Sequence, residues 1–180
     1  MKAHFRMLAG YNAWANRRLY AAVLALPPGA AARDLGAFFR SPLATLNHVM
    51  VADLVWLARL RAIAPPPFDL DHVLHDDMAE LDLARRALDD DICRAVEETD
   101  PAATIRYRRG DAEMAAPAAE LLAHLFNHQT HHRGQVHAML TRLAAEGVGA
   151  GVGAGVEAGV GAGAPALDLV YHQRERAGAA

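Results

Sequence analysis

Prolines divide this chain into four long segments, each with the residue spacing of an amphipathic helix. Within each segment the larger apolar side chains recur every three or four positions, which is the period of a helix that buries one face. The dividing prolines stand at positions 27–28, 42, 65–67, 101 and 117. Proline ends helices but is tolerated at their first position, so we expect helices over about 5–26, 42–63, 76–98 and 117–146.

Four such segments joined by connections of moderate length predict an all-α four-helix bundle. The chain has 180 residues, of which 53% are hydrophobic, enough for one buried core in a domain covering 1–146. A weakly alternating run from Thr104 to Met114, centred on Arg109, Gly110 and Asp111, suggests a small hairpin before the last helix.

A tract of glycine, alanine and valine follows the fourth segment, over 147–164. Such a sequence offers few side chains that could offset the entropy lost on ordering, so we expect a flexible linker. The final segment, 165–180, contains Leu167, Leu169, Val170 and Tyr171. These side chains are expected to pack it back onto the bundle.

Charge and cysteine content exclude several kinds of site. The net charge is −3, and the basic group at Arg106, Arg108 and Arg109 is small, so nucleic acid is not an expected partner. No uninterrupted run of about 18 or more strongly apolar residues predicts a membrane span, and the start does not resemble a signal peptide, so we expect a cytoplasmic protein. Cys93 is the only cysteine, so a metal site would have to use histidine or carboxylate ligands.

Two histidines of the fourth segment fall inside its apolar stripe. At about 100° per residue, His128 and His132 project among Leu121, Leu125 and Val136, toward the core. Side chains four residues apart lie one above the other on a helix, so both rings could bind one ion. His48, in the otherwise apolar second segment, is the expected third ligand.

Other interpretations of these histidines remain open. A lone buried histidine such as His48 can be satisfied by one hydrogen bond, with no metal. His124 and His131 project to the edge of the stripe beside Gln135 and could support the ligands, face a substrate or lie at an interface. The remaining histidines are expected at the surface: His4, His72, His75, His137 and His172.

The fourth segment also has the histidine spacing of the zinc-protease helix H-E-x-x-H. Gln129 stands where that motif has its general-base glutamate, so peptidase activity is disfavoured.

Motifs along most of the chain resemble the DinB family of the DinB/YfiT-like metal-binding four-helix bundles. They are Tyr11-Asn-Ala-Trp14-Ala-Asn16-Arg, Leu46-Asn-His48 with Ala52-Asp53 and Trp56, Asn127-His128-Gln-Thr-His131-His132-Arg133-Gly134-Gln135, and Leu167-Asp168-Leu169 with Tyr171. The resemblance implies an up-up-down-down bundle, often a homodimer, with a metal on one histidine of helix two and two of helix four. Those positions match His48, His128 and His132. Characterised relatives in the wider superfamily are metal-dependent transferases and isomerases that act with low-molecular-weight thiols.

Two functions are therefore weighed. The first is a metal-dependent thiol transferase, or a related hydrolase or isomerase, that holds a divalent Zn, Ni, Fe or Mn ion, with Zn or Ni favoured. Its substrate would be a small molecule such as a low-molecular-weight thiol. The alternative is a non-catalytic metal-binding structural or ligand-binding module, in which the ion only stabilises the bundle.

Overall fold

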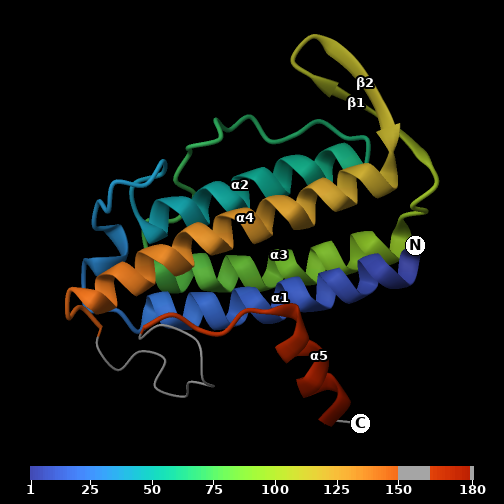
Figure 1. The fold of residues 1–180 in the computed structure, drawn as a ribbon. Coiled ribbons are helices and arrows are strands. Elements are labelled where there is room, and N and C mark those ends of the chain that lie inside the picture. Colours follow the sequence, from blue (N-terminus) through green and yellow to red (C-terminus); the bar gives the residue numbers. More distant parts are fainter. Residues whose placement is uncertain (150–162, 179–180) are drawn as a thin grey trace.

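Four long helices lie side by side and enclose the core of the protein (Figure 1). The structure is a computed structural model that describes residues 1–149 and 163–178. Its elements, in chain order, are α1 Lys2–Leu24, the 3₁₀ turn η1 Ala30–Ala32, α2 Pro42–Leu60, α3 Met78–Glu98, β1 Thr104–Arg109, β2 Ala112–Pro117, α4 Ala118–Ala145 and α5 Leu169–Gly178. The described part is thus mostly helical, as expected, but it adds a fifth helix and a two-stranded sheet to the four long helices.

Capping side chains account for the starts of α2 and α3. Ser41 precedes α2, and its Oγ accepts a hydrogen bond from the Ala44 amide at 3.2 Å, while Pro42 occupies the first turn. Asp77 precedes α3 and accepts hydrogen bonds from two amides of its first turn, at 2.8 and 3.0 Å. Both helix starts therefore fall within two residues of the expected positions.

The order of helix directions differs from the up-up-down-down order implied by the family resemblance. Asp53 pairs with Arg85, and farther along both helices Arg61 pairs with Asp91, so α2 and α3 run parallel. α1 and α4 run the opposite way, which makes the order up-down-down-up (Figure 1). The cause is the long segment 61–77, which returns along the outside of the bundle before α3 begins.

The hairpin expected near residue 110 is confirmed. β1 and β2 pair antiparallel from Thr104 opposite Pro117 to Arg109 opposite Ala112. Gly110 lies in the turn with a φ of 60°, a left-handed conformation that glycine adopts without steric cost. The hairpin projects beyond the end of the bundle where α4 begins (Figure 1).

Helix α2 is buried on most sides by the other helices. By length and composition alone, this helix is apolar enough to cross a membrane. However, 72% of its most apolar stretch of 18 residues is buried inside the protein. This is the pattern of the core helix of a soluble protein. α2 therefore supplies much of the interior against which α4 places its histidines.

Helix α5 lies across α1, and its main anchor is not one of the expected apolar residues. His172 is only 7% exposed and sits against Tyr11 and Trp14, with ring centroids 6.2 and 5.5 Å away. The expectation that His172 lies at the surface is wrong, because the crossing of α5 over α1 covers it. Val170, by contrast, is exposed.

The expected linker, 147–164, lies largely outside the described residues. At its far end, Gly163 has a φ of 91° and lies so close to α4 that an added Cβ would be 2.5 Å from the Cβ of Ala144. Ala164 is buried beside it. The end of the tract that is described therefore packs closely on α4.

Candidate metal centre

Three imidazoles from two helices converge on one point. His48 comes from α2, and His128 and His132 lie one turn apart on the face of α4 that packs on α2. The Nε2 atom of His128 is 3.3 Å from that of His48 and 3.1 Å from that of His132. One ligand atom from each ring lies within 4.8 Å of the others, so these histidines could hold a metal ion.

Hydrogen bonds on the far side of two rings direct their Nε2 lone pairs toward this point. His48 Nδ1–H donates to the carbonyl oxygen of Leu70 at 2.7 Å, and His132 Nδ1–H donates to Oε1 of Gln135 at 2.8 Å. A neutral imidazole that donates from Nδ1 has a lone pair on Nε2. Supporting bonds of this kind orient histidine ligands in many metal sites.

The spacing of the three nitrogens fits a divalent cation. Two nitrogens bound tetrahedrally to one Zn²⁺ at the usual distance lie about 3.3–3.4 Å apart, close to the 3.1 and 3.3 Å found here. A proton on Nε2 of His128 could form a hydrogen bond to only one of the other two Nε2 atoms, whereas a metal cation could bind all three nitrogens. The residues present therefore suit a metal ion bound by three histidines.

The electrostatic surroundings oppose protonation of these rings. Burial, together with the repulsion of a second positive charge by the nearby rings of His132 and His48, lowers the pKa of His128 to about 3. Burial also lowers the pKa of His48 and of His132. All three rings are thus held neutral near pH 7, the form that binds metals.

A pocket of about 620 Å³ opens directly onto this cluster. His48 and His132 contribute to its lining, and Phe39 stacks on the His48 ring with centroids 3.9 Å apart and planes 19° apart. The segment that precedes α2 supplies Phe39, and the returning segment 61–77 supplies another wall through Leu70. The candidate metal centre is therefore open to a small molecule on one side.

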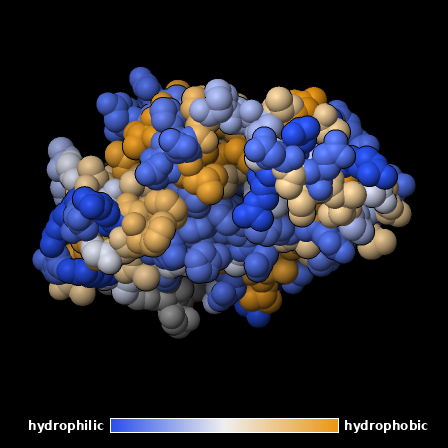
Figure 2. Space-filling model, turned by 90° about the horizontal axis from the view of Figure 1, so that it is seen from above, coloured by the Kyte–Doolittle hydropathy of each residue, from blue (hydrophilic) through white to orange (hydrophobic). Residues whose placement is uncertain are grey.

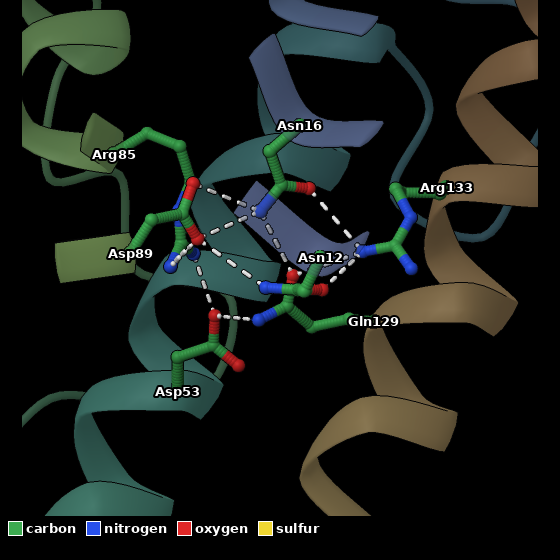
Figure 3. A network of polar contacts seen from close by, with 7 residues as sticks. All are labelled: Asn12, Asn16, Asp53, Arg85, Asp89, Gln129 and Arg133. Carbon is green, nitrogen blue, oxygen red and sulfur yellow. Dashed lines mark hydrogen bonds and ion pairs between the residues drawn. The ribbon is translucent and has the colours of Figure 1, made fainter. Parts of the chain in front are cut away.

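A second polar cluster fills the centre of the bundle beside the histidines (Figure 3). All four long helices contribute to it, and each member is at most 3% exposed: Asn12, Asn16, Asp53, Arg85, Asp89, Gln129 and Arg133. We call these seven residues the central polar network. Gln129 and Arg133 follow His128 and His132 directly in the chain, so the network holds the same two turns of α4 that carry the histidines.

Opposite charges within the network balance one another. Arg85 lies 2.6 Å from Asp53 and 2.8 Å from Asp89, and Gln129 Nε2–H donates to Asp53 at 2.7 Å. Burial raises the pKa of Asp53 to about 6, although Arg85 opposes this shift. Two arginines and two aspartates together form a neutral set, which is the condition for burying charges at tolerable cost.

The remaining histidines divide into two kinds. His131 lines the pocket and accepts a hydrogen bond from Gln135 Nε2–H at 3.0 Å, which links it to His132 through one side chain. His124 is exposed and packs on Trp56 with ring centroids 4.2 Å apart, away from Gln135. Neither ring joins the three-histidine cluster, while His4 and His72 are exposed as expected and His75 and His137 are partly buried.

The sequence pattern did not identify the central polar network or the pocket wall. The signal for the network was present in Gln129 and Arg133, polar residues that face inward from the same turns as the histidines. Nothing in the spacing of Phe39 and Leu70 could have shown their place, since both lie in irregular segments whose path depends on the folded bundle.

Comparisons with known proteins place the chain in a family. The profile of the DinB family matches residues 1–150, which is most of the chain and includes all three histidines of the cluster. No curated protein and no solved structure gave a significant match. Because the match spans α1 to α4 and the candidate metal centre, the chain belongs to the DinB family.

Proposed function

We propose that this protein is an enzyme that binds a divalent metal ion on His48, His128 and His132 and uses it to activate a small thiol. The observation that carries the proposal is that the three histidines converge beside an open pocket of about 620 Å³, which His48 and His132 line. A site that only stabilises a fold is usually closed by a fourth protein ligand, whereas catalytic sites keep a position free. No fourth histidine, cysteine or carboxylate joins the cluster in the described part of the chain.

The residues around the cluster have definite tasks in this proposal. Leu70 and Gln135 hold the rings of His48 and His132 in the orientation that a metal requires. Phe39 covers one face of His48 and limits the access of water to it. A divalent ion held there would supply Lewis acidity, which lowers the pKa of a thiol or water beside it. Zn and Ni are the favoured ions, because imidazole ligands suit both.

Cys93 has no part in the proposed chemistry. It lies on α3, does not line the pocket, and burial raises the pKa of its thiol, which makes it a poorer nucleophile. We therefore expect Cys93→Ala to retain any activity of the wild type. The homodimer implied by the family resemblance and the cytoplasmic location expected from the sequence belong to the same proposal.

Two measurements test the proposal in sequence. Elemental analysis of untagged protein should show about one divalent ion per chain, and His128→Ala should lack it. The metal-loaded wild type should then accelerate the conjugation of small thiols to electrophiles, while His128→Ala gives the uncatalysed rate. If the wild type carries its ion but accelerates no reaction in a broad panel, the non-catalytic module becomes the better interpretation.

A further inference from the structure

Aromatic and apolar side chains make up much of the pocket lining. Its outer wall includes Phe38, Phe39 and Leu70, and Phe38 is 86% exposed with its ring edge-on to Phe39 at 4.8 Å. An aromatic side chain this exposed leaves a large apolar surface in water. Seen from above, the molecule shows hydrophobic patches set among hydrophilic surface on this side of the bundle (Figure 2).

One charged side chain lines the pocket, and it is acidic. Asp71 lies next to Leu70 in the returning segment, and its other polar neighbours at the mouth are His131 and Gln135. No lysine or arginine lines the pocket among the described residues. Arg40 follows Phe39 in the chain, is exposed and does not contribute to the lining.

This lining favours one class of ligand over another. Aromatic faces together with a carboxylate attract organic cations, through cation–π contacts and charge pairing. At the mouth, a ligand rich in carboxylates would find no lysine or arginine side chain among the described residues and would face Asp71. The like charge of Asp71 would lower the affinity for such a ligand there.

From this complementarity we propose that the pocket binds an amine-bearing molecule with an apolar body. The apolar part lies against Phe38, Phe39 and Leu70, and the ammonium group pairs with Asp71. The inference rests on the proposed function, in that it takes this pocket as the substrate pocket of the metal centre. The proposed substrate would differ from carboxylate-rich thiols in its charge, although both would carry the thiol group that the proposed function requires.

A matched series of ligands tests the charge preference. 2-Phenylethylamine, 2-phenylethanol and 3-phenylpropionate share a phenyl body and differ in the charge of the end group. We expect isothermal titration calorimetry on the wild type to give affinity in the order amine, alcohol, carboxylate. The amine-to-carboxylate ratio should fall at least about fivefold in Asp71→Asn and further in Asp71→Lys, which replaces attraction by repulsion.

Two matched variants control for general changes. Asp69 belongs to the same segment but does not line the pocket, so Asp69→Lys should change the ratio much less than Asp71→Lys does. Phe38→Ala should weaken binding of all three ligands by a similar factor, because it removes apolar contact and no charge. Metal content is measured for each variant, so that any metal contribution to carboxylate binding cancels in the comparison.

Defined outcomes overturn the inference. It fails if Asp71→Lys changes the ratio by less than twofold, or if Asp69→Lys changes it equally. It also fails if the wild type prefers the carboxylate and Arg40→Ala removes that preference. These results are separate from the proposed function: a protein without metal could keep the charge preference, and a metal-loaded catalyst could lack it.

Discussion

Helix α4 carries two buried polar clusters with opposite properties. On one side, Gln129 and Arg133 join the central polar network, in which the charges of two arginines and two aspartates balance. On the other, His128 and His132 meet His48 with three Nε2 atoms facing one another. Residues adjacent in the sequence thus belong to one cluster whose charges are paired internally and to another whose imidazole nitrogens face one another.

The difference shows which cluster maintains the fold and which is available for binding. The network links all four long helices and contains both members of each ion pair, so its charges are balanced within it. In the histidine cluster the pKa of His128 is lowered, so its ring stays neutral, and an open pocket lies on one side. Nδ1 of His128 also has no hydrogen-bond partner among the described residues. We therefore expect mutations in the network to lower stability, and mutations in the histidine cluster to lower metal affinity.

The largest effect is expected from breaking the network at Arg85. Arg85→Met leaves Asp53 and Asp89 buried without their shared cation, which should lower the free energy of unfolding by about 3–5 kcal/mol. Urea denaturation followed by circular dichroism measures this change. Arg86→Met, which removes the partner of Asp82 from the exposed side of the same helix, should cost less, about 1 kcal/mol. Equal losses in the two variants would contradict the structural role of the network.

Removal of any single ligand should come next. His48→Ala, His128→Ala and His132→Ala should each weaken metal binding by more than about 100-fold, beyond the effect of outer residues. His137→Ala, on the same helix but outside the cluster, should retain the wild-type affinity. Competition with a chelator of known affinity gives the values. Stoichiometric, tightly bound metal in the His48 variant would reject the three-histidine site.

A smaller loss is expected when only the support of a ligand is removed. Gln135→Leu deletes the acceptor of His132 Nδ1–H, which should weaken metal binding by about 10- to 100-fold. The same chelator competition measures it, and the unfolding free energy of the metal-free protein should change little. An unchanged affinity would show that Gln135 does not orient the ring. His124→Ala should have a smaller effect than Gln135→Leu, because His124 packs mainly on Trp56, at 4.2 Å between ring centroids, and stacks more loosely on His128, at 5.9 Å, without a hydrogen bond to a ligand.

The mildest test is the pH dependence of the metal-free protein. The pKa of His128 is lowered to about 3 in the folded state, from about 6.5 in the unfolded chain, so below pH 6.5 the unfolded state binds the extra proton. The contribution of His128 to stability is therefore present above pH 6.5 and is lost as pH falls toward 3, by at most about 1.4 kcal/mol per pH unit. Urea melts from pH 7 to 4.5 measure this slope, and it should flatten in His128→Ala.

Much of the helical architecture could be predicted from local sequence. The stripe spacing and the prolines located α1 to α4 to within a few residues, since capping at Ser41 and helix termination depend on neighbouring residues. The hairpin at Gly110 was predicted for the same reason. The direction of α3 relative to α2 was not, because it depends on the path of segment 61–77, which carries no strong local pattern.

The candidate site divides in the same way. The spacing of His128 and His132 within an apolar stripe, together with His48, predicted the three residues that the structure brings together, since helical periodicity alone decides which side chains share a face. The roles of Gln135, Leu70 and Phe39 could not be predicted, because each depends on a contact between segments distant in the chain. The burial of His172 under α5 is a similar case.

The sequence by itself determined the helices, their buried faces and the pairing of His128 with His132, because these follow from a repeat of 3.6 residues and from capping chemistry, and it singled out His48 as the histidine of the apolar second helix. Only the tertiary structure decided how the helices are directed, which charges are paired in the centre and what lines the pocket. Those features arise when segments far apart in the chain meet, and their energies depend on burial and distance, which local pattern does not contain.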